Sequence, residues 1–297
     1  MKFPISNFKL SVSRRSVGAF TLLEVLVVVS LLSLIVLALM QVFSSTQRAF
    51  RAAATQADVL EGSRAAMDLI ATDLHNMTPS GGASNGPVNL TVGPIYYAYS
   101  PLQQSLPGSY PIVQRTNVLN YFFSLSRENT RWIGIGYAVD ATDASPLFSL
   151  YRYYSFTNIT ADPRALFNDF TNQVFNGRWT NSSLSHIIDG VVHLTLRAYD
   201  KNGFWLNTFY PTAAAPMFVP YYNQSAYGET AFYMYSNAVP AAVELELGVL
   251  EDQVLARAES LTFPSITQSN YLAGQSGAVH VFRQRVSIPN VDRTAYQ

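Results

Sequence analysis

A stretch of nineteen uncharged residues near the start of the chain constrains its fold more than any other feature. Between Val25 and Phe43 the polar residues are limited to Ser30, Ser33 and Gln41. A helix of this length, at about 1.5 Å per residue, approaches the hydrocarbon thickness of a bilayer, about 30 Å. The stretch is therefore predicted to span a membrane.

Basic residues ahead of this stretch predict its orientation. Lys2, Lys9, Arg14 and Arg15 all lie in the range 1–19, which contains no Asp or Glu. Because positive charge beside a span stays in the cytoplasm, this leader is expected there, with the bulk of the chain across the membrane. The predicted topology is a single pass through the membrane; the prepilin resemblance described below implies that this is the inner (cytoplasmic) membrane and that the C-terminal head is periplasmic.

The start of the apolar stretch differs from that of an ordinary secretory signal, whose small-residue cleavage site follows its apolar region. Here the small residues Gly18 and Ala19 precede the apolar stretch, and a single carboxylate, Glu24, sits at its edge. An isolated carboxylate entering a bilayer is costly unless it finds a partner. Glu24 is therefore predicted to have a functional role.

This segment resembles the class III signal of type IV prepilins and type II secretion pseudopilins, the prepilin-type cleavage/methylation motif. The residues that carry the resemblance are Gly18 to Val27, GAFTLLEVLV. The resemblance implies that a prepilin peptidase cuts between Ala19 and Phe20 and that the new Phe20 amine is methylated. It also implies that Glu24 sets assembly register by pairing with the terminal amine of a neighbouring subunit. The implied partners are the prepilin peptidase, other pilin or pseudopilin subunits and an inner-membrane assembly platform.

The cleavage position has an alternative. The family usually has Gly before the cut, whereas here Ala19 precedes Phe20 and Gly18 lies one step earlier. A cut between Gly18 and Ala19 would make Glu24 sixth in the mature chain instead of fifth, so the bond between Ala19 and Phe20 is favoured. The plain alternative is a chance carboxylate at the start of a simple single-pass anchor.

The chain beyond the apolar stretch is predicted to continue as the same helix. It contains no Pro until Pro79 and a single Gly, Gly62, and the segment from Thr78 onward ends the helix. The predicted helix is 20–78, with about 24–43 in the membrane and 44–78 amphipathic. The stripe expected to pack on a globular head, from its steps of three and four residues, is Leu60, Ser63, Met67, Ile70, Leu74 and Met77. Residues placed on other faces are Arg64, Asp68, Asp73 and Asn76.

The remaining segment, 79–297, is predicted to be a β-rich periplasmic head. Short aromatic and β-branched runs alternate with Gly, Pro, Asn and Asp, as in strands joined by turns. Because strands follow the helix rather than alternate with long helices, the predicted class is α+β and pilin-like: a long N-terminal helix packed on a largely antiparallel β head. The expected strands are 95–99, 120–125, 132–139, 148–156, 191–199, 231–235, 243–250 and 279–288.

The distal half resembles a narrower group, the J-type minor pseudopilins and W-type minor pilins, in which a strand leads to an aromatic-acid turn and a tryptophan. The layout also resembles that of Verru_Chthon cassette proteins. Two segments rich in Asn, Tyr and Phe, 151–183 and 206–238, exceed the compact J-type pattern. The segments that carry the J-type resemblance are 64–74, 187–191, 196–200, 203–205, 239–245, 282–283 and 286–289.

Composition limits the possible chemistry. The chain has no Cys, which excludes disulfides, thiolate nucleophiles and sulfur-ligated metal sites. Beyond the leader, residues 1–19, it has 15 basic against 19 acidic side chains, a net charge of −4. Nucleic acid is not an expected partner, because coating it usually requires a basic excess.

The sequence does not predict an enzyme, a cofactor or a metal site. Gly134-Ile135-Gly136 lacks the third glycine and the following helix of a dinucleotide site. A calcium loop from Asp162, Asp169 and Asp200 is disfavoured, because these residues are not spaced at alternate positions. The histidines, which have no short metal-binding spacing, are His75, His186, His193 and His280.

Two functions remain open. The first is a minor pilin or pseudopilin of a type II protein secretion system or type IV pilus-like assembly, processed by prepilin peptidase and placed in or at the tip of a filament. The second is an envelope-anchored binding or adhesion protein that displays an aromatic β head, with 18 Tyr and 18 Phe in the chain, through a prepilin-like anchor. Both functions use the same anchor, so only the properties of the head can distinguish them.

Overall fold

The computed structural model describes residues 21–81, 88–94, 102–106, 113–140, 147–207, 218–224, 229–261 and 265–290. The predicted leader, the cleavage and methylation positions and the strand expected at 95–99 lie outside these ranges. The chain forms two compact units, Met1–Ala53 and Ala54–Gln297, and each is described by itself.

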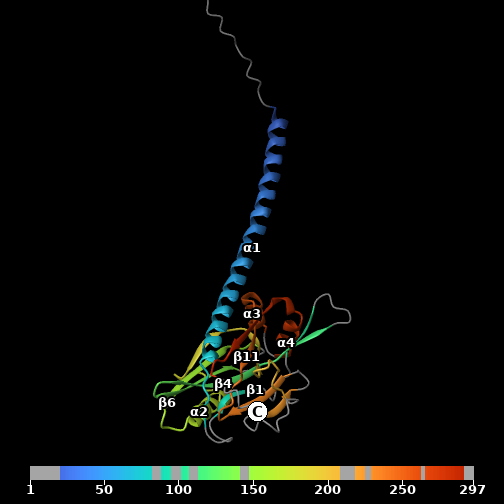
Figure 1. Cartoon of the computed structure of the whole chain (residues 1–297). Coiled ribbons are helices and arrows are strands. Elements are labelled where there is room, and N and C mark those ends of the chain that lie inside the picture. The colour runs from blue at the N-terminus through green and yellow to red at the C-terminus, as the bar shows by residue number, and fades with distance from the viewer. Residues whose placement is uncertain are drawn as a thin grey trace, which may run out of the picture. The chain divides into compact units, whose positions relative to one another are not determined.

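A single helix, α1, runs over Leu22–His75 (Figure 1). The Thr21 carbonyl accepts the N–H groups of Glu24 and Val25 at 3.0 and 3.2 Å, and its hydroxyl accepts the Glu24 N–H at 3.3 Å. A threonine at this position satisfies donors that the first turn of a helix leaves unpaired. The bounds of α1 lie within three residues of the predicted helix, 20–78, at each end.

Within the unit Ala54–Gln297, the C-terminal part of α1 packs on the rest of the unit through the predicted stripe. Burial of each large apolar side chain contributes about 1.5–3 kcal/mol, so this stripe is a major attachment of the helix to the head. One expectation is wrong: Asp73, placed on another face, is only 8 % exposed, because partners on two strands enclose its carboxylate. The stripe residues that are 0–3 % exposed are Ser63, Met67, Ile70, Leu74 and Met77, and Leu60 is half-buried.

Seven strands form the larger sheet, in the order β7-β6-β5-β4-β1-β10-β9, and every neighbouring pair is antiparallel. Along β5, Ile133, Ile135 and Tyr137 enter the core shared with α1, whereas Trp132 and Ala138 enter a second core. This period of two is expected of a strand buried on both faces. The bounds are β1 Val88–Pro94, β4 Asn120–Glu128, β5 Arg131–Val139, β6 Leu150–Asn158, β7 Leu184–Ile188, β9 Phe218–Gln224 and β10 Glu229–Tyr235.

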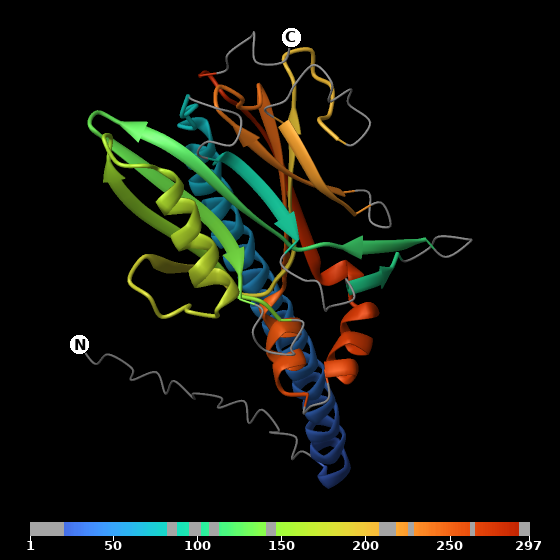
Figure 2. The ribbon, with the colours of Figure 1, turned by 90° about the horizontal axis from the view of Figure 1, so that it is seen from below.

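The second core is covered by helix α2, Arg164–Phe175. Figure 2 shows α2 on one face of the β4-β5-β6 part of the sheet, with the C-terminal part of α1 on the other. Leu166, Phe170 and Val174 point from α2 into this core, at the three- and four-residue steps of an amphipathic helix. The segment that exceeds the compact J-type pattern therefore contributes a packed layer to the head.

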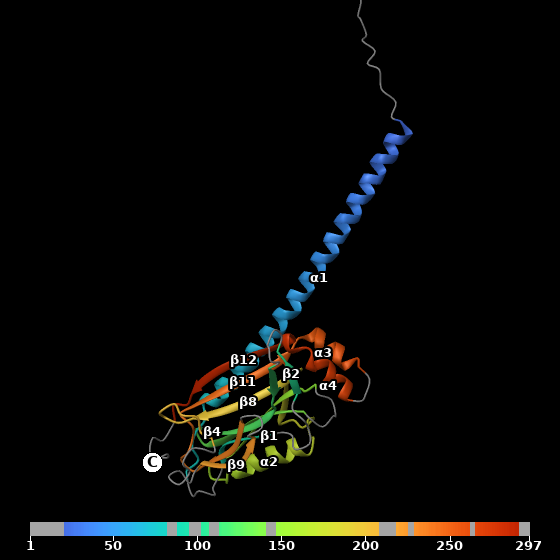
Figure 3. The ribbon, with the colours of Figure 1, turned by 90° about the vertical axis from the view of Figure 1, so that its right-hand side faces the viewer.

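A three-stranded antiparallel sheet, β12-β11-β8, lies beside these layers (Figure 3). Two short helices and a two-stranded sheet pack at one end of it, around Leu250, Ala258 and Leu272. The bounds are β8 Val191–Tyr199, β11 Ala242–Leu250, β12 Val279–Ser287, β2 Leu102–Ser105, β3 Gln114–Asn117, α3 Asp252–Glu259, α4 Ser265–Ala273 and the 3-10 helix η2 Ser276–Ala278.

The fold class predicted from the sequence is confirmed in its coarse form: a long apolar N-terminal helix and a largely antiparallel β region make an α+β chain. Seven of the eight expected strands correspond to β4, β5, β6, β8, β10, β11 and β12. The sequence did not predict β1, β2, β3, β7, β9 or the three short helices.

Candidate functional site

The first candidate site is the apolar surface of α1 within the unit Met1–Ala53. From Leu22 to Phe43 the large apolar side chains are 47–85 % exposed. Among the described residues, α1 is the one helix long and apolar enough to cross a membrane. Exposed apolar surface of this extent is unfavourable in water, so it requires a cover outside the unit.

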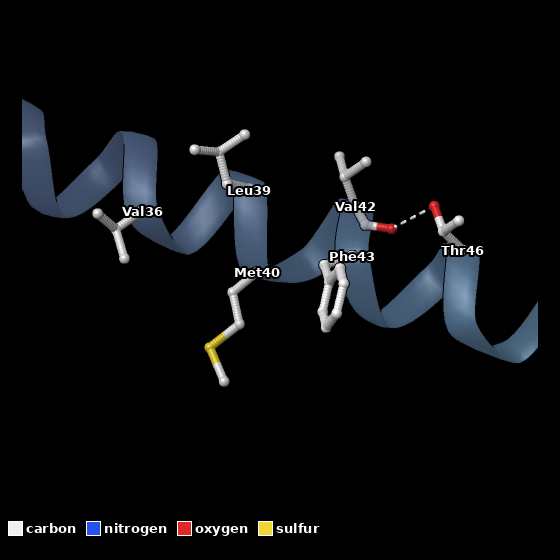
Figure 4. Close-up of a pocket in the computed structure, with 6 residues that line it drawn as sticks. All are labelled: Val36, Leu39, Met40, Val42, Phe43 and Thr46. Carbon is white, nitrogen blue, oxygen red and sulfur yellow. Dashed lines mark hydrogen bonds between the residues drawn. The ribbon is translucent and has the colours of Figure 1, made fainter.

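A shallow hollow lies on this surface, and Figure 4 shows the side chains around it. All of them project from one helix, and the hydroxyl of Thr46 donates to the Val42 carbonyl at 2.9 Å. Within the described residues no second element forms an opposite wall. The hollow is thus an open helix surface rather than an enclosed ligand cavity. Its lining residues are Val36, Leu39, Met40, Val42, Phe43 and Thr46.

Glu24 lies in the first turn of α1, on this exposed surface. Its backbone N–H is held by Thr21, but within the described residues its carboxylate forms no hydrogen bond or ion pair. A carboxylate in the first turn interacts favourably with the positive end of the helix dipole, typically by 0.3–1 kcal/mol. This favourable interaction energy is small compared with the several kcal/mol needed to desolvate a carboxylate. A cationic or hydrogen-bonding partner would therefore stabilise the carboxylate if this turn enters an apolar environment.

The second candidate site is a buried junction between α1 and the larger sheet. The Asp73 carboxylate accepts the Tyr137 hydroxyl, the Arg152 Nε at 2.7 Å and the Arg152 Nη2 at 3.0 Å. Burial and the neighbouring Asp73 charge raise the pKa of Tyr137, and the hydrogen bond with Asp73 raises the pKa of Arg152. The partners lie 64 and 79 residues away from Asp73. Local sequence carries no signal of such a pairing.

The third candidate site is a network of charges that connects the two larger sheets. Arg197 on β8 donates to Glu229 on β10 at 2.5 and 3.1 Å, and to Glu246 on β11 at 3.2 Å. Arg283 on β12 donates to Glu244 at 2.5 Å and lies 3.2 Å from Glu246. The network holds the strands in register and joins β10 to the three-stranded sheet β12-β11-β8. Half-buried ion pairs commonly have such a structural role.

The carboxylates of this network have shifted pKa values. Burial raises the pKa of Glu229 despite its bonds with Arg197. A hydrogen bond with His193 lowers the pKa of Glu246, and burial opposes this effect. Burial alone would raise the pKa of Glu244, but the hydrogen bond from Arg283 opposes this effect and the pKa is lowered. The arrangement holds Glu244 and Glu246 ionised against their cations and contains no nucleophile paired with a base.

The glycine pair of the sequence Gly134-Ile135-Gly136 has a packing role. A Cβ on Gly136 would lie 2.5–2.9 Å from three ring carbons of Phe170, and a Cβ on Gly134 would lie 2.9 Å from the Leu166 Cβ. Real Cβ contacts are essentially never this close. The absence of side chains at these two positions therefore allows α2 to pack closely on β5. This packing role explains the two glycines without a nucleotide-binding function.

Comparison of the chain with family models, curated protein sequences and solved structures finds no match in any of the three. The roles of the site residues therefore follow from their chemistry and geometry. Among the described residues, no group of three His, Asp or Glu side chains is placed to hold a metal ion.

The three aspartates considered for a calcium loop each have their own partners. Asp200 accepts the N–H groups of Asn202 and Phe204 at 2.9 and 2.7 Å, which closes the turn after β8. Asp169 accepts the Tyr153 hydroxyl at 2.8 Å, and Asp162 accepts the backbone N–H that begins α2. These bonds explain the carboxylates as turn and helix contacts.

The histidines are likewise dispersed. His193 accepts the Val118 N–H at Nδ1, at 3.1 Å, so its Nε2 carries the proton toward Glu246. The other three have separate hydrogen-bond partners: Ser287 for His75, Asp189 for His186 and Glu251 for His280.

Proposed function

We propose that this protein is a minor pilin or pseudopilin of a type II secretion or type IV pilus-like assembly. The observation that carries the proposal is the start of α1, where the Glu24 carboxylate, which has no partner among the described residues, lies on an exposed apolar helix whose continuation packs into a β head. The prepilin-type signal around Phe20 adds the sequence argument. The proposed role is non-catalytic incorporation in or at the tip of a filament.

The proposed architecture has three parts. Residues 1–19 form a cytoplasmic leader, residues 20–78 form the anchor and amphipathic helix, and residues 79–297 form the periplasmic head. Prepilin peptidase removes the leader at the bond between Ala19 and Phe20, with Gly18-Ala19 as the alternative bond, and the Phe20 amine is methylated. The inner membrane then holds the helix until the assembly platform transfers it into a bundle of other pilin or pseudopilin helices.

Glu24 has a defined task in this proposal. In a helix bundle it pairs with the amine of Phe20 on a neighbouring subunit. Such a pair sets axial register, because a partner displaced along the helix leaves a charge unpaired in an apolar environment. The cost of that mispairing favours one register over others.

The first test is intact mass and N-terminal sequencing of the protein from membranes of cells with and without prepilin peptidase. A mature chain that begins at methylated Phe20, formed only with the peptidase, is the expected result. Phe20→Asp should block this processing, whereas Phe8→Asp, a matched change within the leader, should not. A chain that begins at Met1 in both strains would refute the proposed processing.

The second test addresses assembly. Glu24→Ala should leave membrane insertion and cleavage intact while reducing incorporation with partner subunits. Glu61→Ala is the matched control, because it removes an exposed carboxylate from the same helix beyond the apolar stretch. Normal incorporation of the Glu24 variant would contradict the register role.

A second function, display of an adhesive head, is favoured by one observation. Tyr154 and Phe156 on β6 are 40 % and 53 % exposed, and Arg152 and Arg131 lie 5.1 and 4.7 Å from their ring centroids. Exposed aromatic rings beside guanidinium groups are frequent in recognition surfaces. Binding of the full-length protein to a surface polymer, lost in Phe156→Ala and accompanied by no pilin-like partner, would favour this function over the first.

A further inference from the structure

Strand β12 lies at the outer edge of the three-stranded sheet, beside the C-terminal part of α1 (Figure 3). It pairs with β11 over nine residues in continuous register and contains no Pro. Sheet edges in proteins are commonly blunted by bulges, by Pro or by very short strands. None of these three features occurs in β12, so its outer edge is regular enough to pair with another strand.

The ladder with β11 determines which backbone groups of β12 face the outer edge. The Ile288 N–H donates to the Ala241 carbonyl at 3.0 Å, and the Glu251 N–H donates to the Ala278 carbonyl at 2.9 Å. Because every second residue of an antiparallel strand bonds to its partner, the even-numbered residues of β12 face β11 and the odd-numbered residues face away. The outward N–H and C=O groups that form no hydrogen bond within the described residues are those of Val281, Arg283 and Arg285.

A groove of about 460 Å³ lies between this edge and α1. One wall is the end of β12, and the other is a segment of α1 in which Ala71 and Thr72 have small side chains. His75 crosses the groove at one end, where its Nδ1 donates to the Ser287 carbonyl at 2.9 Å. A donor from outside the sheet therefore already occupies one outward carbonyl of β12. The addition of an extended peptide to such an edge is a general mode of recognition.

The two faces of β12 determine which side chains an added strand could carry. Phe282 and Val286 pack in the core shared with α1, whereas Val281, Arg283 and Arg285 lie on the exposed face. The Val281 residue is 43 % exposed and the Arg283 side chain is 57 % exposed. Side chains directly opposite one another in neighbouring strands lie on the same face. Residues of an added strand opposite the two arginines would therefore lie on the exposed face.

Arg285 is the cation that a ligand on this face would meet. The Arg283 guanidinium is already paired with Glu244 at 2.5 Å and with Glu246 at 3.2 Å. Arg285 forms no ion pair within the described residues, and its guanidinium lies 4.3 Å from the ring centroid of Tyr199. Two copies of β12 paired with each other would bring these arginines together, and like charges directly opposite are destabilising. Charge therefore favours an acidic strand from another protein over a second copy.

We propose that the outer edge of β12, residues 281–287, binds an extended acidic segment of a partner protein as an added antiparallel strand. The segment bonds to the outward N–H and C=O groups and places a carboxylate opposite Arg285. Its alternate side chains face the groove, where Ala71 and Thr72 favour small residues and the Asp68 carboxylate disfavours acidic ones. The fitting pattern is an acidic residue between small uncharged residues. The inference goes beyond the proposed function and depends on neither processing nor filament assembly.

The test uses the full-length protein in detergent and a fluorescein-labelled, amidated peptide, Thr-Ser-Glu-Thr-Thr-Ser-Val. Fluorescence anisotropy measures binding, and hydrogen exchange with mass spectrometry should show slower exchange in β12. Replacing the Glu of the peptide by Lys should weaken binding about 2- to 30-fold, since an attractive cross-strand pair becomes repulsive. N-methylation of this Glu, whose N–H faces β12, should abolish binding. N-methylation of the Ser before it, whose N–H faces away, should not.

A charge reversal in the protein tests the assigned cation. Arg285→Glu should reverse the preference, so that the Lys peptide binds more tightly than the Glu peptide. Arg257→Glu, at an exposed position of α3, is the matched control and should keep the original preference. No protection of β12, equal effects of the two N-methyl groups, or an unchanged preference in Arg285→Glu would each overturn the proposal. Protection of β12 at high protein concentration without peptide would assign the edge to a second copy and would also overturn it.

Discussion

The packing of α2 onto the glycines of β5 gives a sharp test of how the head is built. Phe170 is fully buried, and its ring centroid lies 5.4–6.0 Å from those of Tyr121, Phe123 and Tyr153. In Gly136→Ala the new Cβ would meet the Phe170 ring at 2.5 Å. A ring enclosed in this way cannot rotate out of the contact, so the helix or the strand must move.

The size of the effect follows from two opposed terms. An extra carbon in a packed core costs about 1–3 kcal/mol. Replacing Gly by Ala within a strand regains up to about 1 kcal/mol of conformational entropy. We expect Gly136→Ala to lower the free energy of unfolding by about 2 kcal/mol. For a unit of this size that corresponds to a fall in Tm of about 4–8 °C.

The assay is thermal unfolding of the full-length protein in detergent, followed by tryptophan fluorescence. Trp132 and Trp179 pack in the same core as Phe170 and report its loss directly. Gly277→Ala is the control, because a Cβ there meets nothing within 4 Å, and it should leave Tm nearly unchanged. If Gly136→Ala is as stable as this control, the proposed packing of α2 is wrong. Adding Phe170→Leu to Gly136→Ala should restore part of the loss, since a smaller side chain relieves the contact.

Two further predictions concern the charged groups of the head. Asp73→Ala should lower the free energy of unfolding of the full-length protein by about 3 kcal/mol, measured by urea denaturation. This value is near the lower end for a broken buried ion pair, because the Arg152 side chain is 21 % exposed. Glu246→Gln should weaken the dependence of stability on acid pH. Because the folded-state pKa of Glu246 is lowered, its contribution to stability is present above the ordinary glutamate pKa, about 4.3. That contribution is lost as the pH falls through the folded-state pKa. Midpoints of urea unfolding between pH 7 and 3 measure this loss.

Matched controls separate these effects from a general loss of charge. Asp68→Ala removes an exposed carboxylate from the same helix as Asp73 and should change stability by less than about 0.5 kcal/mol. Glu259→Gln, at an exposed end of α3, should leave the acid dependence of stability as it is in the parent protein. A Glu246→Gln protein that loses stability with acid as steeply as its parent would contradict the assigned role of that carboxylate.

The long helix and most strands could be predicted because their signals are local. An uncharged stretch, the absence of Pro and a stripe at steps of three and four residues define α1 to within three residues at each end. Strands β5, β8 and β11 are nearly continuous aromatic, aliphatic or β-branched runs bounded by turn residues. The short strands β2 and β3 are rich in Gln, Asn and Arg, which gives them no such periodicity.

The parts that could not be predicted depend on contacts between distant segments. The burial of Asp73 requires Arg152, which lies 79 residues later. The glycines of β5 acquire meaning only once α2 folds back over the strand from Arg164 onward. Glu24 was singled out from sequence because its environment is set by its immediate neighbours.

The described charges of the head and the polar groups of the anchor place different demands on their surroundings. In the head, Asp73 on α1 is paired with Arg152 on β6, and Glu246 on β11 with Arg197 on β8, so the desolvation of both carboxylates is offset within the unit. In the anchor, the serines are satisfied by their own helix, whereas Glu24 and Gln41 are not satisfied by any described group. The folded head therefore gains little from further ionic partners at these positions. The apolar part of α1, in contrast, would be stabilised by partners for its unsatisfied polar side chains. If the proposed function holds, contacts between subunits should depend on Glu24, and Glu24→Ala should impair incorporation without lowering the Tm of the head.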